Sequence, residues 1–219
     1  GGTTWSRANG RSNWTYSWTP SANGTFSLKS RAADDSVNLE TPGAGVSVTV
    51  GSGGGSGSTS SLWTATTTPA VITDSDSAAV ELGVKFTSSV AGQITGIRFY
   101  KGTGNTGTHV GNLWTLSGTR LATVTFGNES ATGWQEALFS TPVPVTAGRV
   151  YVASYLAPNG RYAGDSGYFN ATGVDNPPLH ALRDGVSGGN GVYTYGTTSS
   201  FPSSTWNSAN YWVDVVFSS

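Results

Sequence analysis

The sequence predicts an all-β protein, in which a jelly-roll β-sandwich follows a smaller, partial β segment. Three observations predict this fold class. Apolar and polar residues alternate along much of the chain, which is the period of a half-buried strand. Gly supplies 31 of the 219 residues and often stands where these runs end, as expected for turns. Only 11% of the residues are Asp, Glu, Lys or Arg, so the chain lacks the side chains that usually form exposed helix faces.

The chain divides at a Gly- and Ser-rich run, GSGGGSGSTSS, which occupies residues 51–61. Such a run has nothing to bury and is typical of a flexible linker. It separates residues 1–50 from residues 62–219, and the second part is long enough to bury a core of its own.

In residues 1–50, apolar alternation predicts strands in NWTYSWTP, TFSLKSRA and GVSVTV, each ended by Pro, Gly or Asn. The first part also contains the motifs GGTTW, WTYSW, GTFSLKSRAADDSVNLETPG and VSVTV. In these motifs it resembles the C-terminal half of a bacterial immunoglobulin-like repeat, which implies a spacer without its opening strands. Because such a segment would leave a sheet edge unpaired, we expect it to associate with a second copy or to pack on the jelly roll.

In residues 62–219, strands are expected in AVELGVKF, ITGIRFYK, NLWTLSG, TRLATVTF, WQEALF, RVYVASYL and YWVDVVF. About eight short strands joined by Gly and Pro turns are typical of a sandwich or jelly roll. Between residues 155 and 211 the strand signals thin out while aromatic residues continue. A long irregular stretch of this kind indicates binding loops.

A set of longer motifs covers nearly all of residues 69–217: ELGVKF, ITGIRFYKGTGNTGTHVGNLW, GTRLATVTF, GWQEALFSTPVPVTAGRVYVASYLAPNGRYA, PPLHALRDGVSGGNGVYTYG and NYWVDVVF. In these motifs the chain resembles a family of bacterial extracellular domains of unknown function that stand beside immunoglobulin-like repeats. The resemblance implies a β-sandwich accessory module of secreted or cell-surface proteins that act on polysaccharide or adhere to it. It supplies no functional residues.

Charge and composition exclude several kinds of partner. The formal net charge is −1 and the 11 basic residues are scattered, so no basic patch is expected for nucleic acid or an anionic membrane. The chain has no Cys, which excludes disulfides and thiolate metal sites, and its two His disfavour a zinc or copper cage. Neither a membrane span nor a signal peptide is evident, and we expect the sequence to be a piece of a longer secreted protein.

The strongest candidate ligand site is the aromatic and polar stretch at residues 155–211. A sugar has apolar C–H faces and a rim of hydroxyls, so a binder needs flat rings beside planar donors and acceptors. We expect the site to be centred on Tyr162, His180 and Tyr193 or Tyr195. Further contacts are expected from Arg161, Asp165, Asn190 and Trp206, and from His109 in the Gly-rich loop 101–114. For any single aromatic residue, the alternative is a structural role in closing the end of the sandwich.

A candidate calcium site precedes and enters the first strand of the second part, in TDSDSAAVE. Asp74, Asp76 and Glu81 would supply the carboxylate oxygens that a hard cation prefers. The run lacks the Gly and the downstream Glu of an EF-hand loop, and a solvated acidic turn is the alternative.

Evidence for catalysis in the sequence is thin. The G-x-S-x-G and H-E-x-x-H motifs are absent. Glu129 and Glu136 could form a glycosidase pair, and His180, Tyr162 and Arg161 could serve a lyase. A poised acid or base needs a charged partner or burial that the sequence does not show, so we favour a non-catalytic carbohydrate-binding module. A lyase, a glycoside hydrolase and a structural or adhesion spacer are the alternatives.

Overall fold

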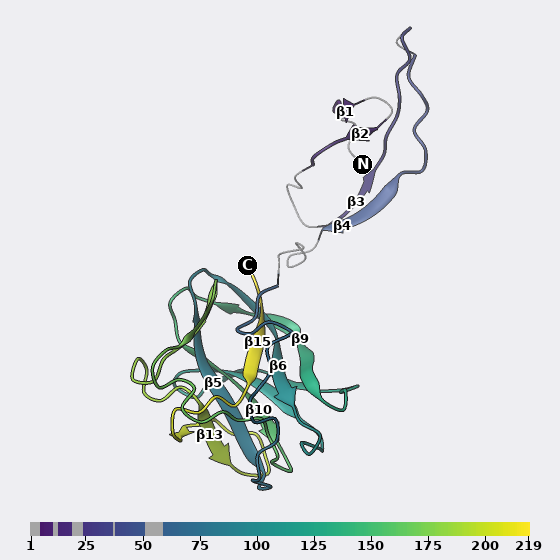
Figure 1. Cartoon of the computed structure of the whole chain (residues 1–219). Helices are drawn as coiled ribbons and strands as arrows, with labels where there is room; N and C mark the ends of the chain where they lie inside the picture. The colour runs from purple at the N-terminus through teal and green to yellow at the C-terminus, as the bar shows by residue number, and fades with distance from the viewer. Residues whose placement is uncertain (1–4, 11–12, 19–23, 37, 51–58) are drawn as a thin grey trace. The chain divides into compact units, whose positions relative to one another are not determined.

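The computed structural model describes residues 5–10, 13–18, 24–36, 38–50 and 59–219. The chain forms two compact units, Gly1–Gly57 and Ser58–Ser219. The described residues form strands, turns and irregular segments with no helix, which confirms the all-β prediction (Figure 1). Within these ranges there is accordingly no helix long and apolar enough to cross a membrane. Most of the predicted linker lies outside the described residues.

The first unit contains two small antiparallel sheets. One pairs β1 (Asn9–Gly10) with β2 (Trp14–Thr15), and the other pairs β3 (Gly24–Leu28) with β4 (Val46–Val50). Two-stranded sheets have little to bury their side chains against, and several large apolar residues are exposed: Trp5, Trp14, Tyr16, Leu28, Leu39 and Val46. The predicted strand NWTYSWTP is shorter than expected, and self-association of this unit stays a prediction.

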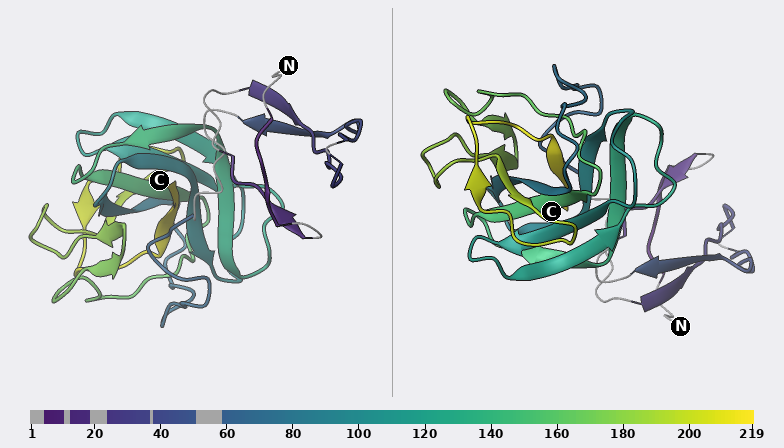
Figure 2. Two further views of the ribbon diagram at one scale, coloured as in Figure 1. Left: turned by 90° about the horizontal axis from the view of Figure 1, so that it is seen from above. Right: turned by 90° about the horizontal axis from the view of Figure 1, so that it is seen from below.

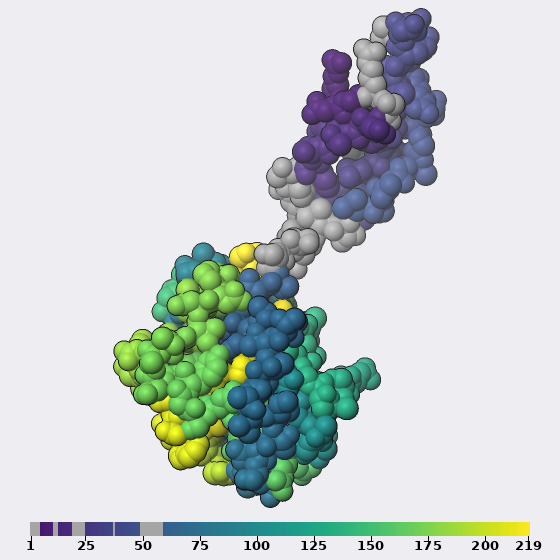
Figure 3. Space-filling model, in the orientation of Figure 1, coloured from purple at the N-terminus to yellow at the C-terminus, as the bar shows by residue number. Residues whose placement is uncertain are grey.

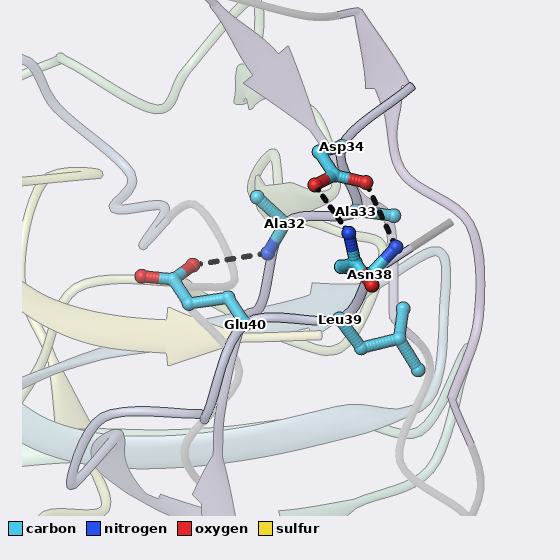
Figure 4. A pocket seen from close by; sticks show the side chains of 6 residues that line it. All are labelled: Ala32, Ala33, Asp34, Asn38, Leu39 and Glu40. Carbon is cyan, nitrogen blue, oxygen red and sulfur yellow. Dashed lines mark hydrogen bonds between the residues drawn. The ribbon is translucent and has the colours of Figure 1, made fainter. Parts of the chain in front are cut away.

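A loop between β3 and β4 is held by its own polar side chains (Figure 4). The Asp34 carboxylate accepts hydrogen bonds from the Asn38 side-chain amide at 2.9 Å and from the Asn38 backbone N–H at 2.8 Å. These bonds hold the pKa of Asp34 below its usual value. Glu40 accepts a hydrogen bond from the backbone N–H of Ala32 at 3.1 Å. The carboxylates that line this shallow depression are therefore used to close the loop.

The second unit is built from two antiparallel sheets (Figures 1 and 2). The larger sheet has the strand order β11-β12-β5-β10-β7-β8, with β13 also paired to β5 and β14 paired to β13. Its strands are β5 (Val80–Ser88), β7 (Val110–Thr115), β8 (Arg120–Thr125), β10 (Tyr151–Ala157), β11 (Val174–Asn176), β12 (Leu179–Ala181), β13 (Val192–Tyr195) and β14 (Ser204–Thr205). The smaller sheet has the order β15-β6-β9, formed by β15 (Val213–Ser218), β6 (Gly92–Lys101) and β9 (Gly133–Val145).

One edge of β5 pairs with two strands, β12 and β13, and the other edge pairs with β10. The central strand β10 runs along one edge of β5 over its whole length from Tyr151 to Ala157. On the opposite edge, β13 pairs with Val80–Gly83 and β12 pairs with Phe86–Ser88. The β13 strand and the β11–β12 hairpin therefore attach to opposite ends of the same strand edge.

The core fills the space between the two sheets, as the alternating pattern predicts. Val80, Leu82, Val84 and Phe86 of β5 are all buried, while residues between them face the other side of the sheet. Tyr155 of β10 stacks on Phe99 of β6 with ring centroids 4.1 Å apart. The two sheets thus share one apolar core, which is consistent with the predicted β-sandwich.

A strap formed by residues 59–79 precedes β5 and runs along one face of the unit (Figure 3). Ser60 forms a β-bridge with Phe217, so the end of the predicted linker belongs to the folded unit. The side chains of Leu62 and Trp63 are buried. Their backbone N–H groups donate to the carboxylate of Asp214 at 2.7 and 3.3 Å. Asp214 therefore pins the strap to β15.

The outer face of the larger sheet carries a second apolar cluster. It consists of Trp114, Val152 and Val192, with Phe201 packed against them. Phe201 belongs to the β13–β14 loop, residues 196–203, which begins directly after Tyr195. The Phe201 and Trp114 rings are 5.8 Å apart and nearly perpendicular. The loop thus folds over the outer face of the sheet.

Candidate functional site

Four tyrosines and two aspartates gather where β13 meets the start of β5. We call Asp74, Asp76, Tyr162, Tyr193, Tyr195 and Tyr211 the tyrosine–aspartate cluster. The register of β13 on β5 places Tyr195 opposite Val80, only a few residues after Asp76 in the chain. Residues from four separate parts of the sequence therefore meet at this end of the sandwich.

The two aspartates shape the turn that carries them. Oδ1 of Asp74 accepts the backbone N–H of Asp76 at 2.8 Å, and Oδ1 of Asp76 accepts that of Ala78 at 2.9 Å. The same turn is tied to the segment after β10. The N–H of Asp74 donates to the carbonyl of Tyr162 at 2.8 Å, and the N–H of Arg161 donates to the carbonyl of Asp76 at 2.6 Å. These backbone bonds fix Asp76 beside Tyr162.

The second oxygen of Asp76 faces the tyrosine hydroxyls. The hydroxyl of Tyr195 donates to Oδ2 of Asp76 at 2.7 Å, and that of Tyr162 lies 3.5 Å from the same oxygen. The hydrogen bond to the Asp76 carboxylate, aided by burial, raises the pKa of Tyr195 to about 12. Burial, with the nearby Asp74 and Asp76 charges, also raises the pKa of Tyr162. Both phenols therefore keep their protons at neutral pH and act as hydrogen-bond donors.

The rings of the cluster pack edge to face. Ring centroids are 5.7 Å apart for Tyr162 and Tyr211, 6.2 Å for Tyr193 and Tyr211, and 5.7 Å for Tyr193 and Tyr195. Tyr211 is buried at the base, whereas Tyr195 is 57% exposed. The cluster therefore offers an aromatic ring at the surface that is supported from below by other rings.

The structure does not bring His180 to this cluster. His180 lies opposite Thr87, seven residues along β5 from the partner of Tyr195, so about 23 Å separates the two positions along the strand. Nδ1 of His180 is 2.7 Å from Oδ1 of the exposed Asp175. The expected site centred on both His180 and the tyrosines is thus split between two ends of β5.

Two other residues expected to contact the ligand, Asp165 and Asn190, form structural hydrogen bonds instead. Asp165 accepts hydrogen bonds from the N–H groups of Ala70 and Val71 at 3.0 and 2.8 Å and from Nε1 of Trp212 at 3.0 Å. Asn190 is buried and accepts the backbone N–H of Lys85 at 2.6 Å. Both side chains hold neighbouring segments together rather than facing a surface ligand.

His109 is also buried, contrary to the expectation that it lies at the edge of an open loop. Its Nδ1 lies 2.8 Å from the Glu129 carboxylate and its Nε2 lies 2.8 Å from Oδ1 of Asn105. Lys101 binds the same carboxylate at 2.7 Å. Burial lowers the pKa of His109, although the bond to Glu129 opposes this. Through Glu129, this network joins β6 to the loop that follows it, and a role of Glu129 in a glycosidase pair stays untested.

Trp206 and Arg161 remain accessible. Trp206 is 59% exposed directly after β14, and Arg161 is half-buried beside Tyr162. Neither side chain has a contact with the tyrosine–aspartate cluster among the interactions seen in the described residues.

The three expected calcium ligands do not converge. Glu81 is buried on the outer face of the larger sheet, where its carboxylate binds Ser154 and Asn112. Asp74 and Asp76 instead cap their own turn. No group of three or more His, Cys, Asp or Glu side chains in the described residues is arranged to hold a metal ion. Calcium binding stays an untested prediction.

Sequence reasoning missed Tyr211 and assigned Asp74 and Asp76 to a metal rather than to the tyrosines. Tyr211 stands in NYW directly before the last strand, where it reads as part of a core run. Only the pairing of β13 with β5 shows that these residues meet.

Comparison with known protein families gives a match to the second unit. A family model described as "Domain of unknown function (DUF4082)" matches residues 66–213, which form most of the second unit. No curated protein matches the chain.

Proposed function

The chain belongs to the DUF4082 family of domains of unknown function, and from this premise we propose that residues 59–219 form a non-catalytic module that binds a saccharide at the tyrosine–aspartate cluster. The observation that carries the proposal is the exposed ring of Tyr195, whose hydroxyl is fixed by Asp76. A fixed, exposed ring is suited to stacking on the C–H face of a sugar, since little side-chain freedom is lost on binding.

The polar groups of the cluster support the same ligand class. The hydroxyls of Tyr162 and Tyr195 and the carboxylates of Asp74 and Asp76 lie at one site, which provides donors and acceptors for sugar hydroxyls. The raised pKa values of the phenols favour binding over base catalysis, because a protonated phenol is not a base at neutral pH. We further propose that the parent protein is a secreted or cell-surface bacterial protein, as its composition and sequence resemblance suggest.

Replacing Tyr195 with alanine should weaken saccharide binding by roughly 3- to 10-fold, because stacking on one aromatic ring contributes about 1 kcal/mol. Tyr195→Phe should retain most of the affinity if stacking dominates. The measurement is a binding panel of insoluble and soluble polysaccharides, followed by calorimetry on the one that binds. The thermal melt of each variant should match that of the parent, since Tyr195 is largely exposed.

His180→Ala provides the matched control, because the His180 side chain is 29% exposed and lies at the other end of β5. It should bind like the parent. A loss of affinity in His180→Ala with none in Tyr195→Ala would place the site on the β11–β12 hairpin. Reducing-sugar and unsaturated-product assays on the same panel test the enzyme alternatives, and product formation would refute the non-catalytic assignment. A folded protein that binds no polysaccharide would favour a spacer.

A further inference from the structure

The Glu81 carboxyl group is buried on β5, opposite Thr194 of the strand that carries Tyr195. Only one of its two oxygens has a hydrogen-bond partner in the described part of the chain. Glu81 is 1% exposed. Oε1 accepts hydrogen bonds from the hydroxyl of Ser154 at 2.5 Å and from the side-chain amide of Asn112 at 3.0 Å. In the described part of the chain, Oε2 of Glu81 and Oδ1 of the fully buried Asn112 have no partner. Two buried acceptors therefore lack a donor in one network.

The β13–β14 loop covers this network. The Asn112 amide also donates to the hydroxyl of Ser199 at 3.1 Å, and Phe201 packs on Trp114. Nε1 of Trp114 in turn donates to the hydroxyl of Ser154 at 2.7 Å. The loop is thus attached to the outer face of the sheet through residues that also touch Glu81.

The loop is directly continuous with the candidate ligand site. Thr194, one residue before Tyr195, is the cross-strand partner of Glu81, and Gly196 donates its N–H to the carbonyl of Ala79 at 3.0 Å. The loop therefore begins at the residue after Tyr195, the exposed ring of the cluster.

A proton on Glu81 would add a hydrogen-bond donor to this buried network. An ionised Glu81 adds only acceptors, while the neutral acid supplies one O–H donor to a region with two unpaired acceptors. The charged groups that interact with Glu81 are few: Arg120 of β8 favours its ionised form, and the phenol of Tyr155 on β10 is affected by its charge. Burial has the largest effect and raises the pKa of Glu81 to about 7, against the hydrogen bonds from Ser154, Asn112 and the loop residue Ser199, which favour the ionised form.

We propose that Glu81 is a proton-controlled latch for the β13–β14 loop, closed when the carboxyl is neutral and loosened when it is ionised. The effect on the loop does not depend on any ligand at the cluster. The consequence for ligand binding, namely weaker binding when the latch is open, rests on the proposed function of the cluster.

The direction of the pH effect follows from the raised pKa. Between the ordinary carboxyl pKa of 4.5 and about 7, the closed state holds more protons than a state in which Glu81 meets water. Closure is therefore favoured at low pH and weakens as pH rises towards 7, after which the effect levels off. Since each pK unit between the two states is a tenfold factor, loop opening should increase roughly 10- to 30-fold from about pH 5.5 to about pH 8.

The test is amide hydrogen exchange of residues 196–203 at these two pH values, corrected for the intrinsic effect of pH and performed without ligand. The parent should lose protection at the higher pH, and Glu81→Gln should show little change because its amide does not titrate. Glu136→Gln, a change at an exposed carboxyl, should behave like the parent. An equal pH response in Glu81→Gln, or none in the parent, would overturn the latch.

Ser199→Ala offers a second variant in case Glu81→Gln folds poorly. It removes the loop hydroxyl that meets Asn112 and should raise exchange at about pH 5.5 towards the parent's level at about pH 8. Unchanged exchange would count against the latch. A metal ion could fill the site in place of a proton. In that case, the loop would be protected at about pH 8 in calcium or sodium, and the protection would be lost with a chelator or when a large organic cation replaces the metal ion. This result would also overturn the proposal.

A binding measurement at the same two pH values separates the latch from the proposed function. Affinity that falls at the higher pH in the parent but not in Glu81→Gln would support both. A loop that responds to pH in a protein that binds no polysaccharide leaves the latch supported and refutes the proposed function. If exchange in the loop responds to pH but the affinity for the polysaccharide does not, the proposed link between the loop and Tyr195 is overturned.

Discussion

Replacing Trp212 with alanine is expected to lower the free energy of unfolding of the second unit by about 3–5 kcal/mol, the usual cost of removing a buried Trp. Trp212 is 2% exposed, and its ring contacts those of Trp63 and Trp134 at centroid distances of 5.5 and 6.2 Å. Its Nε1 also donates to Asp165. The substitution would open a cavity beneath the strap and leave part of the Asp165 carboxylate without its donor.

Urea unfolding followed by far-ultraviolet circular dichroism measures this loss. Trp206→Ala is the matched control, since it removes the same side chain from an exposed position and should change the free energy of unfolding by less than about 0.5 kcal/mol. Similar losses in the two variants would contradict the packing described for Trp212.

The second large effect is expected for Asp214→Ala, which should destabilise the second unit by about 3–5 kcal/mol by breaking a buried ion pair. Asp214 lies 3.4 Å from the Arg98 guanidinium and accepts the backbone N–H groups of Leu62 and Trp63. Burial raises its pKa to about 6, so the carboxylate is ionised at neutral pH. The variant would leave the buried Arg98 with only the exposed Glu136 as an ionic partner, and it would remove the acceptor of the Leu62 and Trp63 N–H groups.

Glu136→Ala is the matched control, because it removes the second and more exposed carboxylate partner of Arg98. Glu136 lies 3.9 Å from Arg98, but its side chain is 53% exposed, so its loss should cost no more than about 1 kcal/mol. Unfolding in urea at neutral pH compares the variants, and amide exchange of residues 60–67 reports on the strap. A normal strap in Asp214→Ala would show that this carboxylate does not pin it.

The strands of the second unit could be predicted from the sequence because they alternate strongly. Each of the seven predicted runs overlaps an observed strand, and Val80, Leu82 and Val84 face the core as the period requires. The short strands β11 to β14 were not predicted. They have only two to four residues, too few to show a period, and their backbone bonds depend on long-range pairing with β5.

The candidate site could be predicted only in part for the same reason. Tyr162, Tyr193 and Tyr195 were singled out by residue type, and the structure brings them together. Composition could not separate them from His180, because both lie in one irregular stretch. The register on β5 separates them, and register depends on which strands pair rather than on local pattern.

Because β13 and β12 pair with different parts of the same edge of β5, this strand is suited to carrying grafted loops. Each attachment uses its own set of backbone bonds, Val80–Gly83 for one and Phe86–Ser88 for the other. An engineer could therefore exchange the β11–β12 hairpin for a foreign recognition loop while the register that positions Tyr195 stays in place. The same scaffold would then carry a foreign loop at one end of β5 and the proposed saccharide site at the other.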